Sequence, residues 1–88
     1  MIENKLKQYR NKIDKTDEKI VELFAERFKV VRKIGEFKKN NNIQIIDSSR
    51  FQKVLKKVKS IALQKGISED FINEIYKIIH KYSCELEK

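Results

Sequence analysis

The chain has 88 residues, of which 40% are hydrophobic and 39% charged, with no proline, two glycines and a formal net charge of +8. This length supports one domain, and it is close to the size at which a single chain struggles to bury enough surface to be stable alone. The scarcity of proline and glycine excludes collagen-like and linker-like chains and favours long helices over strands and turns. We therefore predict one all-α domain over residues 1–88.

The single cysteine, Cys84, excludes a disulfide within the chain and favours the reducing cytoplasm. No apolar run approaches the roughly 18 residues that a membrane span needs, and residues 1–10 lack the apolar core of a signal peptide. The lysines are spread along the chain and form no basic stripe interleaved with aromatic residues. The sequence therefore predicts a cytoplasmic protein whose lysines mostly form a solvated surface, and which binds neither membrane nor nucleic acid.

The first predicted helix spans about residues 5–39. Its apolar residues recur every seven positions as a coiled-coil seam, which Arg27 alone interrupts. Gly35 weakens a helix by about 1 kcal/mol relative to alanine and does not end it by itself. Three asparagines at residues 40–42 end the helix, because asparagine prefers caps and left-handed positions. The seam consists of Leu6, Tyr9, Ile13, Thr16, Ile20, Leu23, Val30, Ile34 and Phe37.

Two shorter helices are predicted after the long one. Residues 47–49 (Asp-Ser-Ser) supply N-cap chemistry for the second, and Gly66 is the expected C′ residue at its end. Ser68 is the expected N-cap of the third helix, which has acidic residues in its first turn. Their apolar residues are Val54, Leu55, Val58, Ile61 and Ala62, and then Phe71, Ile72, Ile75, Ile78, Ile79, Tyr82 and Leu86.

The long helix is predicted to need a second chain. A helix of about 35 residues is about 50 Å long, roughly twice the length of either shorter helix, so one copy cannot cover the seam. An apolar stripe of that size demands a partner, and a two-fold homodimer with the long helices side by side supplies one economically. A plain two-stranded coiled coil is the alternative, but it leaves the two shorter helices without a role.

Three cations of the long helix need an explanation beyond solvation. Arg27 occupies a seam position, where a guanidinium must be paired, either with Asp17 or Glu26 or with an anion bound in the helical core. Lys38 lies only about 20° off the same face and about 16 Å along the axis, so the two side chains can converge on one small dianion. Arg10 lies about 25 Å from Arg27 and about 100° round the helix, so it reaches such a site only across an antiparallel partner.

Several segments, in this order and spacing, resemble the all-helical chorismate mutases. They are Arg10, residues 23–27 (Leu-Phe-Ala-Glu-Arg), residues 35–38 (Gly-Glu-Phe-Lys), residues 47–50 (Asp-Ser-Ser-Arg) and the pair of Ser83 and Glu87. Residues 10–17 are also similar to the first-helix pattern of the family. Each element alone is weak, but the combined spacing is specific and covers essentially the whole chain.

The resemblance implies an intertwined homodimer of three-helix protomers with two equivalent sites, no cofactor and no metal. Each site would rearrange chorismate to prephenate, for phenylalanine and tyrosine biosynthesis, by a Claisen rearrangement in which an ether C–O bond breaks while a C–C bond forms. The implied site residues are Arg27, Lys38, Asp47, Arg50, Ser83 and Glu87 of one chain and Arg10 of the other.

The roles implied by the resemblance suit these residue types. Arg10 and Arg27 would bind the two substrate carboxylates, because guanidinium forks bind carboxylates bidentately. Lys38 would lie near the ether oxygen, where negative charge grows in the transition state. Ser83 would add a neutral donor, although its hydroxyl has the alternative of bonding back to its own helix.

At the other end of the implied site, Asp47 would accept a hydrogen bond from the ring hydroxyl and Arg50 would support that corner. Asp47 has the additional role of helix N-cap, and one carboxylate can serve both. Glu87 stands where many relatives have glutamine, a donor to the ether oxygen. Since an ionised carboxylate only accepts, we predict that turnover rises on acidification. The alternative for Glu87 is a solvated residue of a frayed tail.

Three further positions are distinctive. Phe51 stands where relatives commonly place a glutamate that holds the substrate hydroxyl, so hydroxyl recognition falls more heavily on Asp47. His80 is expected to be a packing residue with a polar tip, because the reaction needs no base. Cys84 is expected to be a small buried apolar residue rather than a nucleophile.

Two rival functions come from other classes. A lyase on the same fold, which splits pyruvate from isochorismate, uses a similar cationic site. The second rival is a non-enzymatic, basic helical dimer that binds nucleic acid. Its affinity for nucleic acid would depend steeply on salt concentration.

Overall fold

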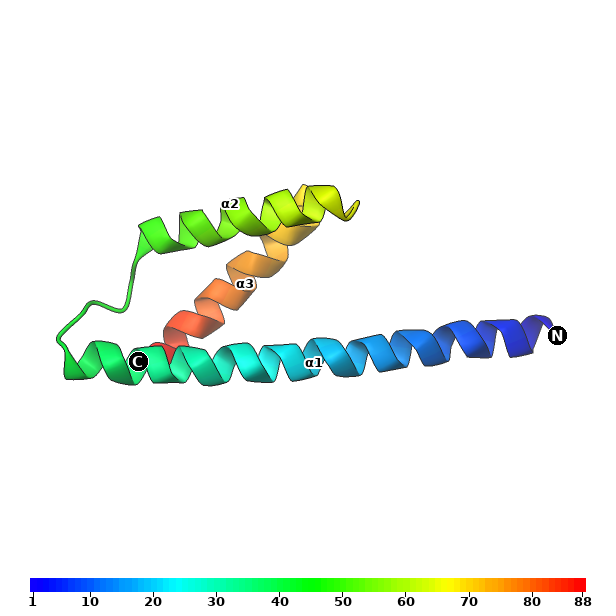
Figure 1. The fold of residues 1–88 in the computed structure, drawn as a ribbon, viewed down its shortest axis with the longest axis horizontal. Helices are drawn as coiled ribbons and strands as arrows, with labels where there is room; N and C mark the ends of the chain where they lie inside the picture. Colours follow the sequence, from blue (N-terminus) through cyan, green and yellow to red (C-terminus); the bar gives the residue numbers. More distant parts are fainter. The chain divides into compact units, whose positions relative to one another are not determined.

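The computed structural model describes all 88 residues. It contains three helices and no strand, with α1 at Ile2–Asn40, α2 at Ser48–Gln64 and α3 at Glu69–Glu87 (Figure 1). The predicted all-α class and the three predicted helices are confirmed, and α1 extends slightly beyond residues 5–39 at both ends. None of the helices combines the length and apolar character that crossing a bilayer requires.

The chain divides into two units, Met1–Val30 and Val31–Lys88. The first, here called the N-terminal unit, consists of the larger part of α1. The second, the C-terminal unit, contains the last turns of α1 together with α2 and α3.

The end of α1 has the geometry that the three asparagines predict. Asn42 adopts a left-handed conformation with φ of 56°. The backbone N–H of Ile43 donates to the carbonyl of Lys38 at 2.8 Å, which closes a Schellman motif. The chain therefore leaves the helix axis after Asn40, and the following loop returns to the Lys38 side chain, which donates to the Ile45 carbonyl.

The connection between α2 and α3 is also as predicted. Gly66 has φ of +72°, and the N–H of Ile67 donates to the carbonyl of Ala62 at 2.8 Å. Ser68 Oγ accepts from the N–H of Phe71 at 3.2 Å and so caps α3. A left-handed glycine followed by a serine cap makes a tight turn, from which α3 folds back to pack against α2 (Figure 1).

The buried core of the C-terminal unit is small. Its fully buried hydrophobic residues are Val31 of α1, Leu55 and Ala62 of α2, and Ile79 of α3. Each helix thus contributes at least one apolar side chain to the interior, but few apolar side chains leave the solvent completely.

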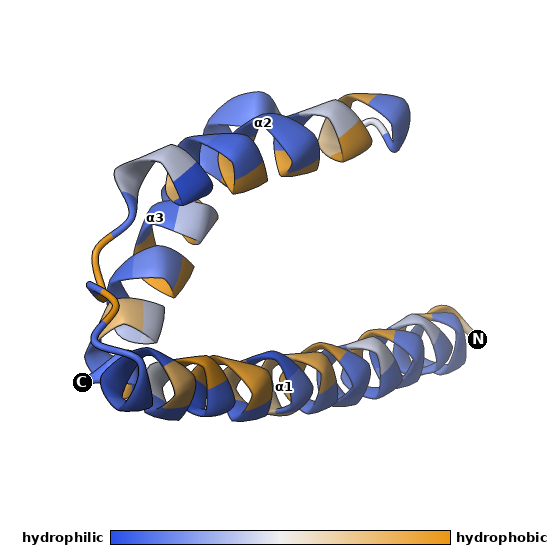
Figure 2. Ribbon diagram, turned by 60° about the vertical axis from the view of Figure 1, so that its left-hand side comes forward, coloured by the Kyte–Doolittle hydropathy of each residue, from blue (hydrophilic) through white to orange (hydrophobic).

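The predicted seam of the N-terminal unit is exposed in the single chain. Figure 2 shows hydrophobic residues recurring in a band along α1. The exposed fraction of the large hydrophobic residues of this seam runs from 44% for Leu6 to 62% for Leu23. Within this unit Phe24 and Phe28 stack one turn apart, with ring centroids separated by 5.8 Å. The band is therefore an apolar surface that the N-terminal unit itself does not cover.

Candidate functional site

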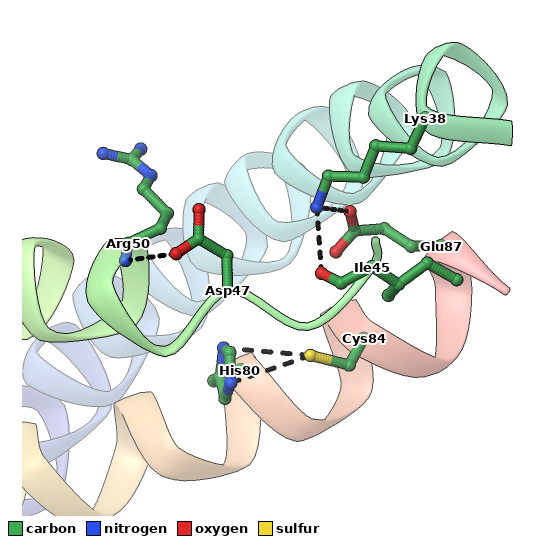
Figure 3. A network of polar contacts seen from close by, with 7 residues as sticks. All are labelled: Lys38, Ile45, Asp47, Arg50, His80, Cys84 and Glu87. Atoms are coloured by element: carbon green, nitrogen blue, oxygen red, sulfur yellow. Dashed lines mark hydrogen bonds and ion pairs between the residues drawn. The ribbon is translucent and has the colours of Figure 1, made fainter. Parts of the chain in front are cut away.

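Lys38, Ile45 and Glu87 meet at one point of the C-terminal unit (Figure 3). Lys38 Nζ lies 2.6 Å from Glu87 Oε1 and donates to the main-chain oxygen of Ile45 at 2.9 Å. The two side chains are mostly buried, with exposed fractions of 17% for Lys38 and 11% for Glu87. Glu87 Oε1 is enclosed, and it forms the ion pair with Lys38. The loop that follows α1 and the last turn of α3 thus hold one ammonium group of α1 in place.

The position of Glu87 shows that it is not a solvated tail residue. It belongs to α3 and is one of its three buried residues. The alternative of a frayed, solvated side chain is therefore wrong, because the last turn of α3 packs on α1. Sequence reasoning singled out Lys38 and Glu87 but missed Ile45, since a main-chain carbonyl leaves no mark in the residue type.

Ser83 lies one turn before Glu87 on α3 and is also buried. Its Oγ donates to the carbonyl of Ile79 at 2.7 Å, so the predicted alternative of bonding back to the helix is confirmed. Residues spaced three and four apart share one face of a helix. His80, Ser83, Cys84 and Glu87 follow that spacing and form one polar face of α3.

Asp47 caps α2 as predicted. Its Oδ1 accepts from the N–H of Arg50 at 3.0 Å and from the hydroxyl of Ser49 at 2.8 Å. These two hydrogen bonds, with smaller contributions from the charges of Lys38 and Lys53, hold the pKa of the Asp47 carboxyl below its ordinary value. The carboxylate is exposed and remains ionised at neutral pH, so it is able to accept a further hydrogen bond from a ligand.

Removing the Asp47 carboxylate is expected to destabilise the protein in a pH-dependent way. Asp47→Ala should lower the urea midpoint at pH 7, because the start of α2 loses its cap. A lowered pKa stabilises the fold fully above the ordinary value of 3.8 and progressively less as the pH falls through the folded-state value. The gap between wild type and variant should therefore shrink below pH 3.8.

Urea unfolding followed by circular dichroism across this range measures the gap, with Asp14→Ala as the control. Asp14 is an exposed aspartate in the middle of α1 and caps no helix. A gap that stays constant down to the lowest pH would show that the carboxylate does not act as the cap.

Arg50 contributes its backbone N–H to this cap, while its side chain is exposed. Figure 3 shows the guanidinium directed away from Lys38 and Glu87. The structure thus brings Asp47 and Arg50 together at the start of α2, but through the backbone of Arg50 and not through its guanidinium.

Two of the positions that the sequence analysis singled out, Phe51 and His80, contact one another. The rings of Phe51 and His80 stack at 4.1 Å between centroids and 19° between planes. The predicted packing role of His80 is therefore confirmed, but its partner Phe51 was not predicted. Cys84 Sγ lies 3.6 Å from His80 Nε2, and Cys84 is half-buried rather than fully buried as predicted.

Arg10 and Arg27 belong to the N-terminal unit, whereas the other predicted site residues belong to the C-terminal unit. Arg10 is exposed and Arg27 is half-buried. Their convergence with Lys38 on one ligand stays a prediction from helical spacing and from the family resemblance.

Comparison with known proteins agrees with the resemblance seen in the sequence. Residues 9–88 match the family described as chorismate mutase type II. The chain is 31% identical over 88 residues to the chorismate mutase of Methanocaldococcus jannaschii, a match that covers 100% of this chain and 88% of that protein.

Longer relatives match over the same region. The chain is 33% identical over 85 residues to the bifunctional chorismate mutase/prephenate dehydratase of Buchnera aphidicola subsp. Acyrthosiphon pisum, covering 97% of this chain and 22% of that protein. It is 32% identical over 88 residues to the protein of the same description in Aquifex aeolicus, of which it covers 24%. The chain therefore spans less than a quarter of the length of these bifunctional relatives.

Proposed function

This chain belongs to the chorismate mutase type II family, and we propose that it converts chorismate to prephenate at a site built around Lys38 and Glu87. The observation that carries the proposal is the Lys38–Glu87 ion pair, which is 2.6 Å long, mostly buried, and formed by residues from opposite ends of the C-terminal unit. Charged side chains are seldom buried unless they are paired, and burying such a pair costs desolvation energy.

The reaction needs positioning and charge rather than a nucleophile or a base. The ether C–O bond breaks while the new C–C bond forms within the same molecule, and no proton changes place. Confining a flexible substrate in its reactive, chair-like geometry removes much of the barrier. Fixed positive charge at the oxygen that becomes negative removes a further part.

Lys38 is well suited to supply that charge. The Ile45 carbonyl and the Glu87 carboxylate hold its ammonium group in position before any substrate arrives. Because the ammonium is already held in position, little reorganisation energy is needed when negative charge develops beside it. Glu87, once protonated, would add a donor to the same ether oxygen.

The remaining groups would bind the ends of the substrate. Arg27 and, from the second chain, Arg10 would each hold a carboxylate, since their forks bind carboxylates bidentately. Asp47 would accept a hydrogen bond from the ring hydroxyl of the substrate, and Arg50 would support this part of the site. Ser83 would act as a neutral donor once its hydroxyl rotates away from the Ile79 carbonyl. The hydrogen bond that it gives up contributes little net free energy.

The homodimer is part of this proposal. The exposed seam of α1 and the small core of the C-terminal unit both favour burial against a second copy of the chain. Seam residues such as Ile13, which is 57% exposed, would then lie in an interface rather than in water. A cytoplasmic location, which the single cysteine favours, completes the proposal.

A product assay tests the function. We expect the purified protein to consume chorismate and release prephenate, and to release no pyruvate from isochorismate. Pyruvate formation would identify the lyase instead. Failure to turn over either substrate, together with a DNA affinity that falls steeply with salt, would favour the nucleic-acid-binding dimer.

A further inference from the structure

Gly35 lies inside α1 and is one of only two buried residues of that helix. Its φ is not positive, so no special backbone conformation requires glycine there. Glycine is also the residue, after proline, that weakens a helix interior most, and alanine would favour the helix. The presence of glycine at this position must therefore have a reason outside the helix itself.

The reason is the approach of α3. A Cβ atom built on Gly35 would lie 2.7 Å from Glu87 Cα, 2.7 Å from the Glu87 carbonyl oxygen and 3.1 Å from the Glu87 carbonyl carbon. These are backbone atoms, so no change of side-chain rotamer relieves the overlap. Even the smallest side chain at position 35 therefore requires the last turn of α3 to move away from α1.

That last turn presents the carboxylate to Lys38. Lys38 follows Gly35 by three residues, so the two lie on the same face of α1, one turn apart. Glu87 rests its backbone on Gly35 and extends its side chain to the Lys38 ammonium, 2.6 Å away. The length of the ion pair is therefore set by how closely the two helix backbones approach at Gly35.

We propose that Gly35 is a positioning residue of the site, because its lack of a side chain lets the α3 backbone lie on α1 and so brings Glu87 onto Lys38. This inference rests on the proposed function, in which the active site is built around the Lys38–Glu87 pair. Gly35 touches no substrate in this scheme and acts only through Glu87 and Lys38.

A double-mutant cycle tests this role. Gly35→Ala is expected to lower kcat by about a hundredfold, the scale that a misplacement of about 1 Å produces. Its circular dichroism spectrum should remain that of a folded helical protein. In the Gly35→Ala background, Glu87→Gln should change kcat by less than about twofold, because Glu87 is already displaced. In the wild-type protein, which keeps Gly35, Glu87→Gln should change kcat by a much larger factor.

The control is Glu36→Ala, an exposed position next to Gly35 on the same helix, which should retain wild-type kcat. Additive effects of Gly35→Ala and Glu87→Gln would overturn the proposal, as would a Gly35→Ala variant with kcat near that of the wild type. A Gly35→Ala variant that fails to fold would also overturn it, since Gly35 would then support the whole unit rather than one turn. An inactive wild type would instead count against the proposed function.

Discussion

Arg27→Ala and Arg10→Ala are each expected to lower kcat/KM by a hundredfold or more, and a mixture of the two inactive proteins should recover activity. Loss of one preorganised donor from a charge-stabilising site typically lowers kcat by about 10²–10³-fold. The shared site of the proposed dimer explains the recovery. A heterodimer contains one site with both arginines and one site with neither.

The size of the recovery follows from random exchange of subunits. In an equal mixture, half of the dimers are heterodimers and half of their sites are intact, so about a quarter of wild-type activity should return. Steady-state kinetics before and after exchange measure it, with the exchange itself verified by mass spectrometry of differently tagged chains. Arg32→Ala, which removes an exposed arginine of α1, is the matched control and should stay active.

Absence of recovery after verified exchange would contradict the shared site. It would leave Arg10 as a residue that affects its own chain alone. That outcome would separate the dimer proposal from the assignment of the reaction, since a product assay on the wild type decides the reaction independently.

The second large effect is expected at Glu87. In the structure its carboxylate pairs with Lys38, and in this form it only accepts hydrogen bonds. Turnover that depends on the protonated form should rise on acidification. Glu87→Gln supplies a permanent N–H donor, so its optimum should move towards neutrality.

Measurement of kcat from pH 5 to pH 8 for both proteins tests this expectation, at constant ionic strength. Glu85→Gln changes an exposed carboxylate on the same helix and serves as the control, because its profile should match that of the wild type. A flat wild-type profile that Glu87→Gln leaves unchanged would mean that Glu87 holds Lys38 and does not act as a donor.

These two experiments examine different parts of the charge arrangement. Arg10 and Arg27 would neutralise the carboxylates of the substrate, an effect that appears in both binding and turnover. The Lys38–Glu87 pair would act on the ether oxygen, where charge appears only as the bond breaks. A change at Glu87 should therefore appear mainly in kcat.

The sequence by itself determined the helices and their ends. The seven-residue period of α1 and the asparagines that end it act over a turn or two of chain, as do the caps at Asp47 and Ser68, so local composition is enough to place them. It also indicated Lys38 and Glu87, through the spacing of residues that carries the family resemblance. The structure confirmed the back-bonding of Ser83, which was an open alternative, and the packing role of His80, which was predicted.

Only the tertiary structure decided which distant residues meet. The sequence showed Gly35 as a tolerated weakness of a long helix, whereas the structure shows that its missing side chain admits the backbone of Glu87. The Ile45 carbonyl on Lys38 and the stacking of Phe51 on His80 are likewise contacts between separate elements. Such contacts depend on how helices approach one another, and no periodicity or cap in a single segment specifies that approach.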